Sequence, residues 1–535
     1  MDLYSFKESE KIRKKTKKAF VRIIFSRFFL VFVAIILEVV LLFFLFDLLS
    51  SNLHLWIILV FNFLITLIIL NVKNQKDTYK IVWIIFINSL PGVGVLFYLY
   101  YVIQKKFNVG SRKLGKIIYE SKKYNKDYFP QVKNNIEISE RNGILNYMYK
   151  SAGYYPYFDN KLTYFSNGRE YFDDVIKEIK KAEKFIFIET FILSDGVIWQ
   201  EMFKILKEKV EAGVEVRIMY DGINTISSFG IRYTKFLRKN GIKAKMFAKI
   251  IPLLSSNHNN RDHRKIIIID DKIAYTGGIN IADEYANIYK RFGVWKDSAI
   301  KVEGMAAMSF TIMFLQIWSM TEDKNNETEY NRYLIEVKKN KILDRKEISE
   351  NEKEDFSYII PYADFPGDTE NVSEQLFKMM FNYAYKYVYV MTPYLILEES
   401  MLDAIVRAKK RGVDVKIFTP HIPDKKFVYF VTRGNYRDLL SNGVEIYEFQ
   451  KGFVHSKVFL HDDKRAVVGT ANLDFRSLYL HYEDGVYIYN DKVINDIKND
   501  FFNLIKYSKK INNFDEIPKY QRFLGGILKI FASQF

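Results

Sequence analysis

The sequence contains no cysteine among its 535 residues. This absence excludes a disulfide framework, a thiolate zinc or iron–sulfur site and a cysteine nucleophile. Proline is scarce, with ten residues, and glycine–serine tracts are missing, so long flexible linkers are not expected. Acidic residues are in the minority, because 63 Asp and Glu stand against 80 Lys and Arg. The resulting net charge of +17 predicts anionic partners.

The N-terminal fifth is rich in long apolar runs. A basic arm over residues 1–27 precedes a membrane region over 28–106, which contains the apolar segments 28–49, 53–72 and 81–103. A run of about 20 apolar residues is long enough to cross the roughly 30 Å hydrocarbon core of a bilayer. We therefore expect the chain to be anchored in a membrane.

The basic flanks of these segments bear on the orientation of the chain. Lys and Arg gather in the N-terminal arm, at 73–80 and at 105–126, and the positive-inside rule places such flanks in the cytoplasm. Three full spans cannot place all three flanks on one side. We expect segment 81–103, which is broken at Pro91-Gly92, to enter the bilayer and return, leaving a cytoplasmic catalytic domain. An ordinary Pro-kinked span with an external domain is the alternative.

The remaining chain contains an internal repeat. Apolar β-rich runs alternate with amphipathic stretches from about residue 146 onward, which is typical of an α/β layered domain. Helix-ending glycines recur at Gly213 and Gly412, and Asn240-Gly241 matches Asn442-Gly443, at offsets of 199 and 202 residues. The offsets predict two homologous halves. We assign them to 107–321 and 356–518, joined by a charged connection over 322–355 and followed by a C-terminal amphipathic segment over 519–535.

Each half carries one copy of the pattern HxKxxxxDxxxxxxGxxN. The two copies are His263, Lys265, Asp270, Gly277 and Asn280, and His455, Lys457, Asp462, Gly469 and Asn472. The His and Lys of each copy precede an apolar β-run, so strand alternation places both side chains on one face. Two matched copies are not expected by chance, and they predict a functional site.

The residue types in these motifs suit a phosphodiester anion. One imidazole can attack phosphorus while the other protonates the leaving alcohol, and the sequence itself leaves open which histidine attacks. The two lysines, with Asn280 and Asn472, would hold the non-bridging oxygens. This chemistry requires no metal or other cofactor, and the chain lacks an Asp/Glu cluster of convincing two-metal spacing.

The motifs resemble the paired HKD motifs of the phospholipase D superfamily, and the similarity to bacterial cardiolipin synthases extends over nearly the whole chain. The resemblance is carried by His263-Arg264-Lys265, Gly277-Gly278-Ile279-Asn280, Thr392-Pro393-Tyr394 and Gly469-Thr470-Ala471-Asn472-Leu473-Asp474, together with the hydrophobic N-terminus. It implies an α/β fold of two pseudo-symmetric phospholipase D-like halves, each a mixed β-sheet flanked by helices, preceded by a helical transmembrane region. It also implies a place in the cell membrane of a bacterium.

The resemblance implies a reaction as well. A phosphatidyl group would pass from one phosphatidylglycerol to another, giving cardiolipin and glycerol through a phosphohistidine. His263, which matches the first-motif histidine, would form this intermediate, and His455 would act as general acid and then general base. Asp270 and Asp462 complete the catalytic motifs, although their position where a strand ends favours a structural or lysine-pairing role.

Two carboxylates follow the motifs at similar places. Asp297 and Glu483 are expected to hold an imidazole in the tautomer that the reaction needs. The other five histidines have no matched partner and are interpreted as ordinary surface or core residues; they are His54, His258, His421, His461 and His481. The apolar stripe of the C-terminal segment, which includes Phe523 and Ile527, would lie on an anionic bilayer or pack against the catalytic domain.

Three other functions stay open on the sequence. A membrane-bound phospholipase D that hydrolyses its substrate would use the same residues, and so would a nuclease of the superfamily. A catalytically idle scaffold that binds anionic lipid would need only the basic arm. Because a nuclease needs no membrane hairpin and a scaffold needs no paired motifs, the expected partners are phosphatidylglycerol, cardiolipin and anionic membrane lipids, without nucleic acid. The sequence does not indicate an oligomeric state.

Overall fold

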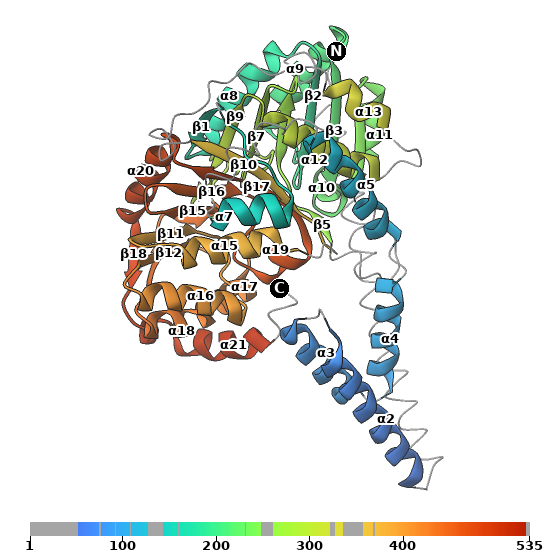
Figure 1. Ribbon diagram of the computed structural model, residues 1–535, viewed down its shortest axis with the longest axis vertical. Coiled ribbons are helices and arrows are strands. Elements are labelled where there is room, and N and C mark those ends of the chain that lie inside the picture. The colour runs from blue at the N-terminus through green and yellow to red at the C-terminus, as the bar shows by residue number, and fades with distance from the viewer. Residues whose placement is uncertain are drawn as a thin grey trace.

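Two mixed β-sheets, one from each half of the sequence repeat, form the body of the molecule (Figure 1). This computed structural model describes residues 52–73, 76–90, 92–106, 109–126, 143–158, 160–230, 232–247, 260–320, 327–334, 357–366 and 370–530. The predicted α/β fold with mixed sheets is confirmed. The predicted arm over 1–27, the apolar segment 28–49 and most of the connection over 322–355 lie outside the described residues.

The two sheets have equivalent strand orders. The first runs β1-β9-β7-β6-β2-β3-β4 and the second runs β10-β17-β16-β15-β11-β12-β13-β18. The strands of the first sheet are β1 (Lys161–Phe165), β2 (Phe185–Thr190), β3 (Glu215–Asp221), β4 (Lys243–Phe247), β6 (Ile266–Ile269), β7 (Ile273–Gly277) and β9 (Ala299–Glu303). Those of the second are β10 (Tyr358–Asp364), β11 (Tyr387–Met391), β12 (Asp414–Pro420), β13 (Glu445–Phe449), β15 (Val458–His461), β16 (Arg465–Gly469), β17 (His481–Tyr489) and β18 (Ser508–Ile511). The motif strands β6 and β15 therefore occupy the same place in their sheets.

Helices cover both sheets and fill the space between them. The helices that follow strands of the first sheet along the chain are α8 (Gly168–Lys181), α9 (Val197–Glu211), α10 (Gly222–Phe229), α11 (Tyr233–Lys239), α12 (Ala307–Met320) and α13 (Glu327–Tyr333). Those of the second half are α15 (Val372–Asn382), α16 (Glu399–Lys410), α17 (Lys426–Gly434), α18 (Tyr436–Ser441), α19 (Phe475–Tyr479), α20 (Val493–Ile505) and α21 (Lys519–Ile530). Helix α12 is apolar around almost its whole circumference, as expected of a fully buried helix.

The apolar core has three parts. One cluster packs α8 and α9 against the outer face of the first sheet, and a second packs α15 and α16 against the outer face of the other. The third is continuous between the halves: it joins the inner faces of both sheets through α12 and α20, with Phe187 and Phe314 stacked at a ring distance of 4.7 Å. Because this central cluster draws on both repeats, the halves form one body.

Two short parallel strand pairs tie the halves together at the polar edge of the interface. β5 (Arg261–Asp262), from the first half, pairs with the start of β17. β8 (Val294–Lys296), also from the first half, pairs with β14 (Gly452–Val454) from the second. Each pair lies directly before a motif histidine.

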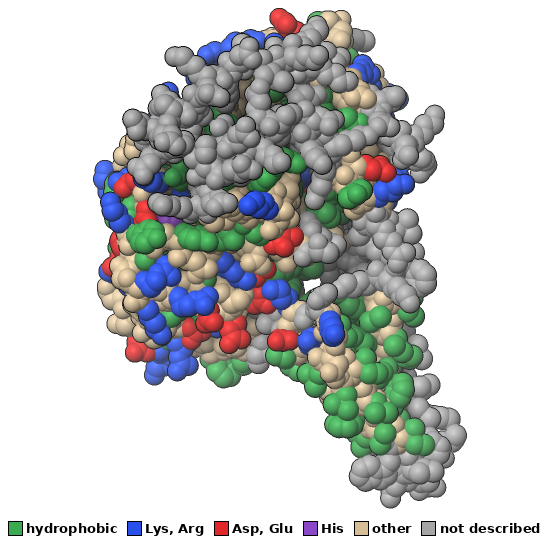
Figure 2. All heavy atoms as spheres, viewed as in Figure 1, with side chains coloured by type: hydrophobic (Ala, Val, Ile, Leu, Met, Phe, Trp, Pro, Cys, Tyr) green, Lys and Arg blue, Asp and Glu red, His purple; other side chains and the backbone are tan. Residues whose placement is uncertain are grey.

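The N-terminal helices project from the body as a stalk (Figure 1). They are α2 (Asn52–Asn71), α3 (Asp77–Ser89) and α4 (Val93–Lys106). The predicted apolar segment 81–103 is split into α3 and α4, which pack against each other with the rings of Trp83 and Tyr98 5.3 Å apart. Hydrophobic side chains cover much of the stalk surface (Figure 2). Within the described ranges, none of the helices is both long and apolar enough to traverse a bilayer.

The segments that connect the stalk to the first sheet pack on both halves. α5 (Val109–Lys126) lies along α12, where the Gln316 side chain donates a hydrogen bond to Ser121. α7 (Gly143–Asn146) continues into a π-helical turn over Tyr147–Ala152, and its Ile144 and Leu145 join the outer core of the second half. Residues that follow the predicted boundary at 107 therefore pack on both halves.

The C-terminal helix α21 packs against α17. The two backbones approach closely where Gly434 meets Gly525, since a Cβ atom on Gly434 would lie 3.0 Å from the carbonyl oxygen of Gly525. Lys529 forms an ion pair with Asp438 at 2.8 Å. The opposite face of α21 stays exposed, with Phe523 retaining 69% of its accessible surface. The C-terminal segment therefore packs against the body of the molecule, as one of its two expected roles requires. An apolar face of α21 stays exposed as well.

Candidate active site

The two motif histidines lie at the seam between the halves. The backbone N–H of His263 donates to the carbonyl of Tyr482 at 2.9 Å, which continues the β5–β17 pairing. The backbone N–H of His455 donates to the carbonyl of Lys296 at 2.7 Å, which continues the β14–β8 pairing. In each pairing the histidine side chain lies next to the residue that directly follows its backbone partner, Tyr482 or Lys296, in the other half. His263 therefore faces a carboxylate of the second half, and His455 faces one of the first.

The carboxylate partners are exchanged between the halves. The Nδ1 atom of His263 lies 2.8 Å from a carboxylate oxygen of Glu483, and that of His455 lies 2.7 Å from Asp297. Both carboxylates are fully buried. The expectation that Asp297 and Glu483 hold imidazoles is in accord with this geometry, but the sequence did not indicate that each would hold the histidine of the other motif.

Burial sets the protonation states of these pairs. Burial would raise the pKa of Glu483, but the adjacent His263 holds it well below the usual range, and His455 likewise lowers the pKa of Asp297. Burial lowers the pKa of His263 well below the usual value against the pull of Glu483. Burial and the nearby Lys457 lower the pKa of His455 to about 4. Because an ionised carboxylate only accepts hydrogen bonds, each neutral imidazole donates from Nδ1 and keeps a free lone pair on Nε2.

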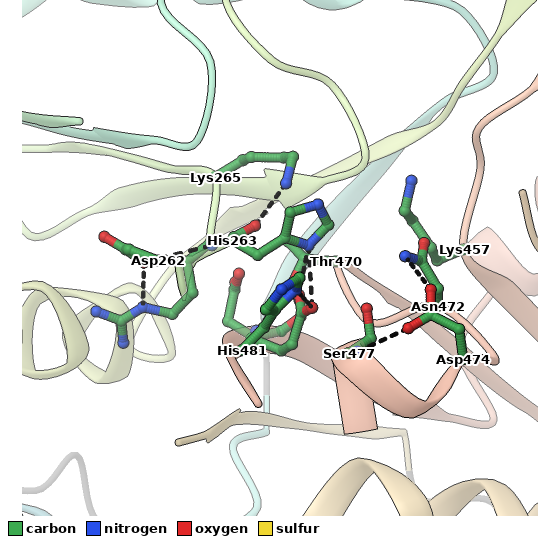
Figure 3. A network of polar contacts seen from close by, with 12 residues as sticks. Asp262, His263, Lys265, Lys457, Thr470, Asn472, Asp474, Ser477 and His481 are labelled. Atoms are coloured by element: carbon green, nitrogen blue, oxygen red, sulfur yellow. Dashed lines mark hydrogen bonds and ion pairs between the residues drawn. The ribbon is translucent and has the colours of Figure 1, made fainter. Parts of the chain in front are cut away.

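The two motif lysines are buried beside the histidines. Lys265 Nζ donates to the carbonyl oxygen of His263, and Lys457 Nζ donates to that of His455. Burial lowers the pKa of Lys265 to about 8 and that of Lys457 to about 7, against the opposing effect of the nearby carboxylates. The site therefore carries cationic groups that titrate within the physiological range. Figure 3 shows Lys265 and Lys457 on opposite sides of the His263 ring.

The motif aspartates have a structural role. Asp270 accepts hydrogen bonds from the backbone N–H groups of residues 183, 184 and 185 at 2.7, 2.7 and 2.8 Å, where β2 begins. Asp462 does the same for residues 385, 386 and 387 at the start of β11. Both residues adopt left-handed backbone conformations, with φ of 55° and 51°. These contacts agree with the structural role that their strand-end position favours, and their place among the catalytic residues stays a prediction.

The two motif asparagines differ in their surroundings. Asn280 accepts from the backbone N–H of Ile192 at 2.9 Å and donates to the Tyr285 hydroxyl at 2.7 Å. Asn472 donates to Asp474 at 2.9 Å, whereas its Oδ1 is buried without a hydrogen-bond partner among the described residues. Their assignment to the binding of substrate stays a prediction.

A glycine makes room for one of the catalytic carboxylates. A Cβ atom on Gly278 would lie only 2.0 Å from Oδ1 of Asp297, the residue that holds His455. The preceding Gly277 has φ of 148° and a Cβ there would meet the Ser298 carbonyl oxygen at 2.4 Å. Gly277 and Gly278 thus permit the close approach of the segment between β8 and β9 that carries Asp297.

His481 is a site residue that the sequence analysis missed. Its Nδ1 lies 3.6 Å from Glu483, and its ring centroid lies 5.4 Å from that of His263. One atom from each of His263, His481 and Glu483 lies within 4.8 Å of the others, so this trio could hold a metal ion. The sequence pattern that could have identified His481 is its position two residues before Glu483, because strand alternation places both side chains on the same face of β17. His421 instead forms an ion pair with Glu448 outside this site.

Comparison with known proteins places this site in a family. The family model described as "Cardiolipin synthase, PLD-like domain" matches residues 175–292 and 377–505. A cardiolipin synthase 2 of Staphylococcus epidermidis is 30% identical over 87% of this chain and 94% of its own length. A cardiolipin synthase of Geobacillus kaustophilus is 29% identical over 87% of this chain and 90% of its own. An uncharacterised protein of Streptococcus mutans is 44% identical over 82% of this chain and 93% of its own.

A solved structure supports the fold. The phosphatidylserine synthase of Haemophilus influenzae superposes with a TM-score of 0.53 at 15% identity, covering 69% of this chain and 92% of that one. Paired α/β halves with two His-Lys motifs at their seam define an enzyme of the phospholipase D superfamily. Within it, the chain belongs to the bacterial cardiolipin synthase family and is a phosphatidyltransferase.

The Gly278→Ala variant should lose activity while keeping its fold. The new methyl group would push the Asp297 side chain off His455, and an error of about 1 Å in a catalytic group can cost roughly 100-fold in rate. We expect kcat to fall by that order, with an unchanged circular dichroism spectrum. The control is Gly526→Ala in α21, where a Cβ would meet nothing within 4 Å. Full activity of Gly278→Ala would contradict the role of Asp297.

Binding of an anion should weaken as the pH rises. Lys457 and Lys265 are charged below their pKa values of about 7 and about 8, so their attraction for a phosphodiester is present at lower pH and lost above these values. Glycerophosphoglycerol, whose phosphodiester does not titrate in this range, should bind at least about tenfold more weakly at pH 9 than at pH 6.5 by calorimetry. Lys457→Arg keeps its charge and should flatten this dependence. A flat profile for the unsubstituted protein would refute the assignment.

Proposed function

We propose that this protein synthesises cardiolipin, transferring the phosphatidyl group of one phosphatidylglycerol to a second and releasing glycerol. The observation that carries the proposal is the reciprocal pair of buried His–carboxylate contacts, which gives one site two imidazoles with free Nε2 atoms. The curated relatives named cardiolipin synthase support the choice of substrate.

In the first step Nε2 of His263 attacks phosphorus, and the bond from phosphorus to the glycerol oxygen breaks. His455 gives its proton to that oxygen, so glycerol leaves as the neutral alcohol. His455 is neutral in the empty site, since its pKa is about 4. The substrate phosphodiester brings a negative charge beside it, which favours the protonated imidazole. The product of this step is a phosphatidyl group joined to His263 by a P–N bond.

In the second step a headgroup hydroxyl of another phosphatidylglycerol gives its proton to His455 and attacks phosphorus. The P–N bond breaks, cardiolipin forms, and His263 regains its free Nε2. Lys265 and Lys457 stabilise the charge that builds on the non-bridging oxygens, together with Asn280 and Asn472. Assigning the attack to His263 follows the order of the family motifs, because the two pairs are nearly equivalent in geometry.

Burial of the catalytic groups favours transfer over hydrolysis. His263 and His455 are 6% and 7% exposed, and Lys265 and Lys457 are each 3% exposed. A site that excludes water protects a covalent intermediate until the acceptor alcohol arrives. This burial supports transfer over a hydrolysis that would use the same residues.

The purified full chain should convert phosphatidylglycerol in detergent or vesicles to cardiolipin and glycerol in equal amounts. His263→Ala and His455→Ala should abolish turnover, whereas His421→Ala, a histidine outside the site, should retain it. Rapid denaturation during turnover should trap lipid phosphorus on His263 through an acid-labile, alkali-stable P–N bond. Phosphatidic acid as the main product would indicate a hydrolase, and a label on His455 would reverse the two roles.

The catalytic body belongs on the cytoplasmic face of a bacterial cell membrane in this proposal. The stalk supports it, because α2 presents a continuous exposed apolar surface that would be unfavourable in water, as Figure 2 shows. These side chains are Ile57, Val60, Phe61, Phe63, Leu64, Leu67, Ile68 and Leu70. The exposed apolar face of α21 lies at the end of the body from which the stalk projects (Figure 1). Lys73, Lys76 and Lys80 supply the basic flank.

The orientation can be tested in cells because the chain contains no cysteine of its own. Tyr119 on α5 is 79% exposed, so Tyr119→Cys should tolerate the change. A membrane-impermeant maleimide should leave it unlabelled in intact cells and label it after permeabilisation. Ser51→Cys, between the first two apolar segments, is the matched control and should react from outside. Labelling of position 119 in intact cells would place the catalytic body outside.

A further inference from the structure

A third imidazole shares the Glu483 carboxylate with His263. His481 begins β17, two residues before Glu483, and Figure 3 shows its ring close to that of His263. The side chain is 11% exposed, and neither of its ring nitrogens has a hydrogen-bond partner in the described part of the chain. Burying an imidazole in this way costs free energy, so a ligand that takes its lone pair would be stabilising.

The three side chains have the spacing of a metal-ligand set. His263 Nδ1 lies 3.0 Å from Glu483 Oε1, which lies 3.6 Å from His481 Nδ1. A tetrahedral zinc ion with bonds of about 2.0–2.1 Å separates its ligand atoms by about 3.3–3.4 Å. The two separations from Glu483 bracket this value, and the two imidazoles offer ligand atoms within 4.8 Å of each other, so side-chain rotations would bring three ligand atoms to bonding distance.

We propose that His263, His481 and Glu483 bind Zn²⁺ or a chemically similar divalent transition-metal ion, and that this ion inhibits the enzyme. Two imidazoles and one carboxylate form a donor set that suits zinc and leaves its fourth position open. Mg²⁺ and Ca²⁺ prefer sets made of oxygen ligands and should not compete. The binding claim depends only on this geometry, and the inhibition claim rests on the proposed function.

The inhibition follows from the two nitrogens of one ring. Without metal, His263 carries its proton on Nδ1 and offers the lone pair of Nε2 to phosphorus. An ion on Nδ1 displaces that proton to solvent, and the ring takes up a solvent proton at Nε2, which keeps it a neutral imidazole bound through Nδ1. The number of protons on the ring is unchanged, but the attacking lone pair is gone. Because the ion sits on the side away from the reacting nitrogen, inhibition should persist at saturating phosphatidylglycerol and lower kcat.

Neighbouring charges set the strength of binding. Glu483 supplies one negative charge, and Lys265 and Lys457 add positive charge within the same site. These ammonium groups repel a dication, so the site should be weaker than a structural zinc site with four protein ligands. The ion would then be exchangeable and its effect reversible by a chelator, as suits an inhibitor.

The experiment uses the full chain in detergent after treatment with EDTA. Cobalt chloride should produce the visible absorption of four-coordinate Co²⁺ with a stoichiometry of one per chain, and zinc chloride should abolish it. Micromolar zinc should lower turnover of phosphatidylglycerol at least about tenfold, and EDTA should restore it. His481→Asn removes one ligand at similar size and should raise the inhibiting concentration at least about tenfold, since loss of a metal contact typically costs 10–100-fold in affinity. His421→Asn is the matched control.

The two claims fail separately. Absence of the cobalt absorption, or equal cobalt binding by His481→Asn and the unsubstituted chain, would overturn the site, and neither result depends on turnover. Cobalt binding that His481→Asn abolishes, with turnover indifferent to zinc, would overturn the inhibition. If phosphatidylglycerol is not turned over at all, the proposed function fails while the absorption still decides the metal site. Inhibition by magnesium chloride equal to that by zinc would contradict the assigned donor chemistry.

Discussion

The exchange between the halves of the carboxylates that hold the motif histidines is the constraint on which the rest of the structure depends. Two parallel strand pairs, β5 with β17 and β14 with β8, fix a register in which His263 meets Glu483 and His455 meets Asp297. Each of these two motif histidines thus takes its carboxylate partner from the other half. The central core around α12 and α20 therefore serves catalysis directly, because it presses the two sheets together at the distance that these hydrogen bonds require.

The pKa values of the site residues follow from their burial between the two sheets. Enclosing two carboxylates, two imidazoles and two ammonium groups between the sheets lowers the pKa values of both histidines and both lysines. The carboxylates stay ionised because the imidazoles lie against them. The empty site thus combines two neutral imidazoles with two lysines whose pKa values lie near neutrality. A phosphodiester anion completes the charge balance, so the substrate itself favours the protonation state that its transfer needs.

The sequence predicted the repeat, the α/β class and the motif residues, because these depend on local pattern and on spacing near 200 residues. It could not predict which carboxylate meets which histidine, since the partners are 220 and 158 residues apart and are joined by strands of two or three residues. Strand pairings this short leave no periodic pattern of apolar residues in the sequence. The role of Asp270 was clear only from its three backbone donors, and that of His481 only from the fold, although its spacing from Glu483 carried a usable hint.

The stalk helices are joined to the second motif through a short chain of contacts. Lys76, just before α3, forms ion pairs with Glu374 and Glu398 at 3.3 and 2.9 Å, and Glu398 accepts a hydrogen bond from Tyr479. Tyr479 ends α19, the helix that Asp474 caps and that follows Asn472 in the sequence. A displacement of the stalk would therefore reach the loop that holds Asn472. In the proposed function this connection would link the position of the stalk to the loop of Asn472, through the ion pairs of Lys76 and the hydrogen bond from Tyr479 to Glu398.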